Sequence, residues 1–222
     1  MIYCNDSDLL AWEPNLAAEA SFAAQTLLQQ DVTLDGSTLI LSGDGPSFDD
    51  SRVRAGHIAV LGGSMPGCFP IIALTTASRA VISRSHELLP AAGAATPENA
   101  ASFAVAVGTG TGIPLAVRTF APQRMVVSEV LRRLAGVDET RGETLLNTAS
   151  LKRPAVLGTL QMIYNALAAA GGDGAAELIV RAELYERLYR RSLRNVVVEI
   201  DTDGDGRANV QRLLRTARLV RA

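Results

Sequence analysis

Three aspartates near the end of the chain have the spacing of a calcium-binding loop. In Asp201-Thr202-Asp203-Gly204-Asp205-Gly206 the acids stand at positions 1, 3 and 5 and a glycine at position 6, as in the first half of an EF-hand. Position 12 of such a loop should be a bidentate glutamate, but here it is Arg212, which brings positive charge to the cation site. We therefore favour a β-hairpin turn, in which Gly and Asp supply positive φ angles. A calcium-dependent protein-binding module is the alternative.

Two glycine-containing segments raise the question of an enzyme. Gly108–Gly112 lacks the lysine of a P-loop and misplaces the third glycine of the dinucleotide fingerprint, so we interpret it as a hairpin tip. Ser64 resembles a nucleophile elbow, but the last histidine, His86, comes too early for that class of hydrolase. His57 and His86 each stand alone, so no metal site is expected. The sequence predicts no catalytic residue, metal or cofactor; a small hydrolase or nucleotide-binding enzyme is the second alternative.

Positive charge gathers at the end of the chain. The formal net charge is −2, yet residues 181–222 hold ten arginines against six acids, a balance of +4 that leaves −6 for residues 1–180. Such a segment can contact nucleic-acid phosphates or an acidic protein surface. Because apolar residues interleave with the arginines and few aromatics stand nearby, we favour an arm that adds a strand or wedge to a partner protein. The expected partner-binding residues are Val196, Val198, Ile200, Arg212, Leu214, Arg215, Arg218, Leu219, Val220 and Arg221.

Apolar periodicity predicts helices at both ends of the chain. A short capped helix starts at Asn5 or Asp6, and a second follows Asn15 with Leu16, Ala20, Ala23 and Leu27 on one face. Three more helices fall within residues 121–194 and predict a small antiparallel bundle. Their apolar faces are Val127, Val130, Leu131 and Leu134, then Leu157, Leu160, Tyr164 and Leu167, then Leu178, Ala182, Tyr185 and Tyr189. The last carries two expected ion pairs, Glu183–Arg187 and Glu186–Arg190.

Short β-type runs fill the middle of the chain. The expected strands are Thr38–Leu41, Ile58–Leu61, Phe69–Leu74, Ala80–Ser83, Phe103–Val107 and Ile113–Val117, with Pro90–Asn99 as a linker. Val196–Ile200 starts a C-terminal hairpin whose second arm is left open between strand and helix, because its arginines recur every third residue. The fold class is α+β: a small helical bundle with an inserted β-barrel- or β-sandwich-like module and a C-terminal β-hairpin arm. The expected divisions are 1–31 (bundle), 32–120 (β module), 121–194 (bundle) and 195–222 (arm).

Composition excludes several classes of protein. The chain has 222 residues, of which 48% are hydrophobic and 20% charged, so it can bury a core and is not a disordered chain. Two cysteines, Cys4 and Cys68, cannot build a disulfide scaffold. The first residues lack the features of a signal peptide, and no apolar run approaches the roughly 18–20 residues of a membrane helix. We expect a soluble protein that is intracellular when made.

Four stretches, taken in their order along the chain, carry a resemblance to a known family. They are the opening Tyr3–Leu10 with Glu13-Pro14-Asn15, the helix start Phe120–Gln123, the helical Leu157–Leu160, and the ending from Val196 to Ala222. In this order they resemble tailed-phage head–tail adaptor (connector) proteins. Residues 32–120 would be an insertion that some adaptors carry, and the three-residue period of Arg212–Arg221 is a departure from a strand-forming arm.

The resemblance implies a structural protein of the virion neck that is present in the host cytoplasm during assembly. Many copies would form a ring that binds the portal protein on one face and a stopper or tail-completion protein on the other. DNA would pass through the lumen without sequence-specific contacts, and no membrane would be involved. The absence of a catalytic constellation from the sequence agrees with a non-enzymatic role.

Overall fold

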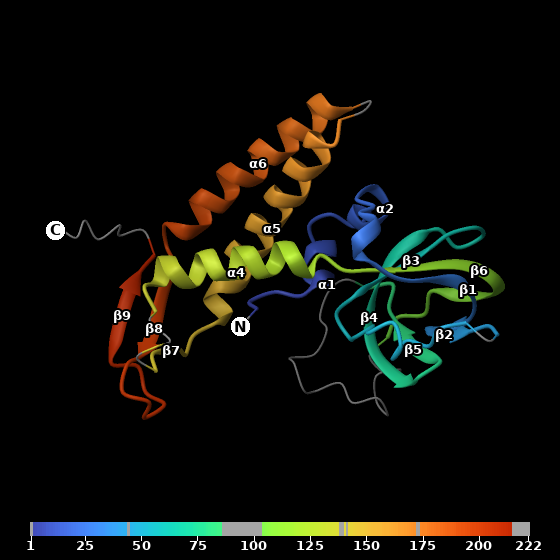
Figure 1. Cartoon of the computed structure of the whole chain (residues 1–222), viewed down its shortest axis with the longest axis horizontal. Helices are drawn as coiled ribbons and strands as arrows, with labels where there is room; N and C mark the ends of the chain where they lie inside the picture. Colours follow the sequence, from blue (N-terminus) through green and yellow to red (C-terminus); the bar gives the residue numbers. More distant parts are fainter. Residues whose placement is uncertain are drawn as a thin grey trace. The chain divides into compact units, whose positions relative to one another are not determined.

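The computed structural model describes residues 2–43, 45–85, 104–137, 140, 142–171 and 174–214, and shows an α+β protein (Figure 1). The chain divides into two compact units. We call Asn5–Phe120 the barrel unit, and Met1–Cys4 together with Ala121–Ala222 the helical unit. No helix in the described part of the chain is both long and apolar enough to cross a bilayer.

The barrel unit opens with short helical elements. Helix α1 (Asp6–Leu10) has a capping box, in which the Asn5 N–H donates to Asp8 Oδ2 and the Asp8 N–H donates to Asn5 Oδ1, both at 2.9 Å. Helix α2 (Leu16–Glu19) and the 3₁₀ turn η1 (Ala23–Gln25) follow. The expected start of a helix at Asn5 or Asp6 is therefore confirmed.

The second expected helix is wrong beyond its first turn, because strand β1 (Thr26–Gly36) begins where that helix should continue. Leu28, Val32 and Leu34 fall on one face of β1 and are at most 3% exposed. Their burial and the pairing of β1 with two neighbouring strands outweigh the helical spacing of Leu16–Leu27. Residues 5–31 thus group with the barrel, whereas the sequence suggested that they join the helical bundle.

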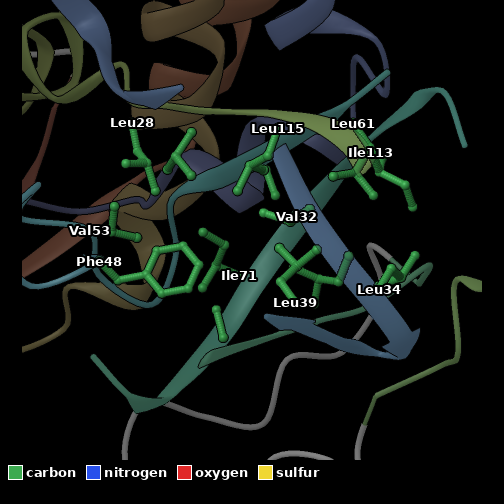
Figure 2. Packing of buried hydrophobic residues seen from close by; sticks show 14 of the residues in the cluster. Leu28, Val32, Leu34, Leu39, Phe48, Val53, Leu61, Ile71, Ile113 and Leu115 are labelled. Atoms are coloured by element: carbon green, nitrogen blue, oxygen red, sulfur yellow. The ribbon is translucent and has the colours of Figure 1, made fainter. Parts of the chain in front are cut away.

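Six antiparallel strands form a closed barrel in the order β1–β2–β5–β4–β3–β6. The other five are β2 (Thr38–Leu41), β3 (Ile58–Leu61), β4 (Gly67–Thr76), β5 (Arg79–Ile82) and β6 (Gly108–Arg118). Closure leaves the sheet without a free edge. The core, drawn in Figure 2, includes Leu28, Val32, Leu34, Leu39, Phe48, Val53, Leu61, Ile71, Ile82, Ile113, Leu115 and Val117. Of the two β modules that the sequence allowed, the structure has the barrel.

The glycine-rich segment Gly108–Gly112 is the first half of β6, so its interpretation as a hairpin tip is wrong. Gly108 pairs with Gly36 and Gly110 with Leu34, and a register shift follows between Val32 and Leu34 of β1. Residues 104–107 are not in a strand, although the Val107 N–H donates to Gly36 O at 2.9 Å. The linker Pro90–Asn99 lies outside the described residues.

The helical unit contains α4 (Ala121–Ala135), α5 (Ala149–Ala169) and α6 (Ala175–Leu193), and α5 packs against both of the others (Figure 1). Gly158 marks a close approach on α5: a Cβ added there would lie 2.9 Å from Val127 Cγ1 and 3.1 Å from Tyr189 Cε2. The rings of Tyr164 and Tyr185 stack with centroids 5.6 Å apart. These contacts hold α4 and α6 to the central helix α5.

A three-stranded antiparallel sheet in the order β7–β8–β9 completes the helical unit. Its strands are β7 (Thr144–Leu145), β8 (Val197–Asp201) and β9 (Val210–Leu213). The C-terminal hairpin is therefore present, and its second arm is a strand as far as Leu213. The expected arm residues 215–222 lie outside the described residues.

Candidate interaction surface

Most of the expected partner-binding residues that the structure describes are buried in their own unit. Val198 and Ile200 are 0% exposed, and Val196 and Leu214 are also buried. Strand alternation puts Val197 on the opposite face of the sheet, where it is 42% exposed and pairs across the strands with Leu213, also 42% exposed. Hence Val197 and Leu213 present apolar surface to the solvent, whereas the expected residues Val196, Val198, Ile200 and Leu214 do not. Arg215, Arg218, Leu219, Val220 and Arg221 lie outside the described residues.

Arg212 also acts within the subunit. Its guanidinium Nη1 donates to the carbonyl oxygens of Ala135 and Gly136, at 3.1 and 2.6 Å. These carbonyls belong to the end of α4, where the helix dipole favours a positive charge and the last carbonyls lack helical partners. Gly136 has a φ of +67°, the left-handed conformation that commonly follows a helix. Arg212 therefore joins β9 to α4 within the subunit, and its expected contact with a partner stays a prediction.

The loop Asp201–Gly206 is organised around one buried carboxylate. Asp201 Oδ1 accepts the N–H groups of Asp203 and Gly204 at 3.1 and 2.7 Å, and Oδ2 accepts that of Gly206 at 2.8 Å. The N–H of Gly206, together with those of Gly204 and Asp203, lowers the pKa of Asp201 below its ordinary value. Gly204 and Gly206 have φ angles of +78° and +79°, as the hairpin-turn interpretation requires.

The carboxylates of Asp201, Asp203 and Asp205 do come together, with one oxygen of each within 4.8 Å of the others. Three carboxylates supply only part of the six to eight oxygens that Ca²⁺ takes. Both oxygens of Asp201 already accept backbone N–H groups, and Arg212 binds α4. The geometry thus fits a turn that satisfies its own backbone.

Of the residues considered for catalysis, the structure describes Ser64 and His57, which lie in the barrel unit and form no hydrogen bond with each other. Within the described part of the chain, Ser64 makes no hydrogen bond to a histidine or a carboxylate, and His57 Nδ1 accepts the backbone N–H of Arg54 at 3.1 Å. His86 lies outside the described residues. A shallow groove of about 350 Å³ runs over β1, β3 and β6, and among the described residues that line it Asp31 alone is ionisable. One carboxylate without a second polar catalytic group gives this groove no recognisable chemistry.

The exposed apolar side chains are distributed unequally between the two units. Among the described residues, the barrel unit exposes two large ones, Trp12 and Val105, whereas the helical unit exposes eleven. Contiguous exposed apolar surface marks interaction sites in soluble proteins. The eleven are Ile2, Met125, Val126, Val130, Leu134, Leu146, Ile179, Val180, Leu184, Val197 and Leu213.

Five of these exposed apolar residues form two rows, one along α4 and one along α6. Val126, Val130 and Leu134 recur every fourth residue on α4 and are 43–50% exposed; we call them the α4 row. Val180 and Leu184 have the same spacing on α6 and are 60% and 43% exposed; we call them the α6 row. The apolar period places Val130 and Leu134 on one face with Val127 and Leu131, but only the latter two are buried. The missed signal is the width of the apolar arc on α4, which exceeds what α5 alone covers.

Comparison of the chain with known protein families, with characterised proteins and with solved structures gives no match.

Proposed function

We propose that the chain is a structural virion protein, a head–tail adaptor of a tailed phage. In this proposal, many copies form a ring that joins the portal vertex to the stopper or tail-completion protein, and DNA passes through its lumen without specific contacts. Each copy is a small helical bundle with an inserted barrel and a C-terminal hairpin arm. The protein acts in the host cytoplasm during assembly and then in the virion neck.

One observation carries the proposal, namely the concentration of exposed apolar side chains on the helical unit. Such surface is costly to leave in water and is covered when copies or partners associate. Most of it lies on α4, α6 and the β8–β9 hairpin; of these, the start of α4 and the hairpin belong to the stretches that resemble adaptors. The described residues form no catalytic constellation that would favour an enzyme instead.

The ending of the chain is the proposed portal-binding element. Val198 and Ile200 are buried and Arg212 binds the end of α4, so we assign the portal contact to the remaining expected residues of the ending, which are Arg215, Arg218, Leu219, Val220 and Arg221. A basic and apolar segment suits an acidic surface with apolar pockets. The proposed contact therefore weakens as the salt concentration rises.

The test is to mix the purified chain with the portal protein of the same phage and to measure masses by native mass spectrometry. The full chain should give one complex with a fixed number of copies per portal. Removal of residues 215–222 should abolish this complex while the far-UV circular dichroism is unchanged. The matched control, Arg215→Gln with Arg218→Gln and Arg221→Gln, keeps the length and should weaken binding through loss of charge.

A truncated chain that binds the portal as well as the full chain does would contradict the role of the ending. A full chain that forms neither a complex nor a ring would contradict the adaptor function itself.

A further inference from the structure

The α4 row and the α6 row are flanked by the same arrangement of charges. On α4, Glu129 and Arg133 stand three residues after Val126 and Val130; on α6, Glu183 and Arg187 stand in the same relation to Val180 and Leu184. Residues three apart are neighbours on a helix surface, so each row has an acid and then a base along one flank. Leu188 continues the α6 row as Leu134 continues the α4 row, although it is half-buried.

Two of the charged side chains on α6, Glu183 and Arg187, form no ion pair in the described part of the chain. The expected ion pair Glu183–Arg187 is absent from the described structure, and both side chains are exposed. By contrast, Glu186 binds Arg190 at 2.5 Å, which confirms the other expected pair. On α4, Glu129 binds Arg132 at 2.5 Å and Arg133 at 2.8 Å, and Arg133 keeps 78% of its side chain exposed.

We propose that the α4 row of one copy packs antiparallel against the α6 row of a second copy of this chain. With Val130 opposite Leu184, Leu134 meets Val180 and Val126 meets Leu188. In two antiparallel helices equivalent flanks lie on the same side of the contact, so Glu129 faces Arg187 while Arg133 faces Glu183. A parallel arrangement puts the two charged flanks on opposite sides, where neither pair forms. The pairing of opposite charges thus selects the antiparallel orientation.

The contact joins two different surfaces and is therefore heterologous. Pairing of α4 with α4, or of α6 with α6, would also match the acid of one copy with the base of the other, but each would leave the other row uncovered. Head-to-tail contacts between α4 of one copy and α6 of the next cover both rows with one type of interface. They generate a ring when the rotation that relates neighbouring copies adds up to a full turn. The inference deepens the proposed function, because it names the surfaces by which copies join in the ring. Two short rows bury less than a stable interface needs, so the contact is weak between free subunits.

Disulfide trapping tests this contact without the portal. Val130→Cys and Leu184→Cys are made on separate chains that carry tags of different mass, and each is oxidised alone and in a mixture at high concentration. The native Cys4 and Cys68 are buried, and burial raises the pKa of the Cys68 thiol, so neither competes. Ala77→Cys, on an exposed turn of the barrel, replaces one partner as the collision control.

The mixture should give a mixed-tag disulfide dimer at least about tenfold faster than either chain alone or the Ala77→Cys control, because the contact holds the thiols close. Glu183→Arg on the Leu184→Cys chain should slow this product about two- to fivefold, the effect of one exposed ion pair. Arg133→Glu on the Val130→Cys chain should then restore it. The double variant Val130→Cys/Leu184→Cys should give a ladder of oligomers.

Two results would overturn the inference: no mixed dimer from chains with unchanged circular dichroism, or Val130→Cys chains that crosslink with themselves as fast as in the mixture. The outcome is separate from that of the portal experiment. If the chain gives the mixed dimer but never binds a portal, the result supports the α4–α6 interface and contradicts the adaptor function. If the chain forms a portal-bound ring but gives no mixed dimer, the result supports the adaptor function and contradicts the α4–α6 interface.

Discussion

Gly158 on α5 offers a precise test of how the helical unit is packed. Replacing it with alanine adds a Cβ that would lie 2.9 Å from Val127 Cγ1 and 3.1 and 3.3 Å from two ring carbons of Tyr189. Real Cβ contacts are longer, and neither neighbour moves easily: Val127 is a β-branched residue that is 4% exposed, and the Tyr189 ring is rigid. Gly158→Ala therefore forces α4 and α6 away from α5.

Two opposing effects set the magnitude. Overpacking of a core costs about 1–3 kcal/mol. Alanine in place of glycine inside a helix returns about 1 kcal/mol. The expected net effect is a loss of roughly 1 kcal/mol of unfolding free energy, measured by urea denaturation followed by circular dichroism. Val127→Ala removes the closest contact, so the double variant should be more stable than the sum of the single effects predicts, by about 1 kcal/mol.

Gly62→Ala is the matched control, because its added Cβ meets only Pro114, at an ordinary 3.6 Å. It should change stability by less than about 0.5 kcal/mol. Close packing of α5 against Val127 and Tyr189 is refuted if Gly158→Ala stabilises the protein by the full helix-propensity gain, or if its effect and that of Val127→Ala simply add.

Three further predictions concern the C-terminal hairpin. Arg212→Gln should lower the unfolding free energy by about 1–2 kcal/mol, because the α4 carbonyls lose a charged donor. The control Arg207→Gln, on the exposed loop, should have little effect on the unfolding free energy. Equal losses in the two variants would contradict the capping role of Arg212. Because the pKa of Asp201 is lower in the folded protein than its ordinary value of 3.8, its contribution to stability is present above that pH and is lost as the pH falls through the folded pKa. Asp201→Asn should reduce this loss of unfolding free energy at acid pH, measured by urea denaturation at several pH values between neutral pH and pH 3. An unchanged loss would show that other carboxylates cause it. Calcium at millimolar concentration should leave the thermal midpoint of the wild type unchanged, whereas a rise that Asp203→Asn abolishes would establish a calcium site.

The local part of the fold could be predicted from the sequence. Strands β2 and β3 have the expected bounds, because short apolar runs between turn residues leave few alternatives. Helices α4, α5 and α6 follow from their 3.6-residue apolar period, and the capping box of α1 follows from Asn5 and Asp8.

What failed depended on contacts between residues far apart in the sequence. Thr26–Gly36 forms a strand because β2 and β6 pair with it, and Gly108–Gly112 extends β6 because β1 lies beside it. The three-residue arginine repeat looked incompatible with a strand, yet Arg212 lies in β9, and the other arginines of the repeat lie outside the described residues. The position of Arg212 beside the end of α4, and the exposure of Val130, depend on tertiary packing that no local pattern encodes.

We propose that the helical unit of this chain assembles into a ring on a portal. Electron microscopy of the purified chain mixed with the portal protein of the same phage tests it most directly. We expect a closed ring with the rotational symmetry of the portal, in which α4 of each copy contacts α6 of the next. A portal that carries no added density at saturating concentrations of the chain would contradict it.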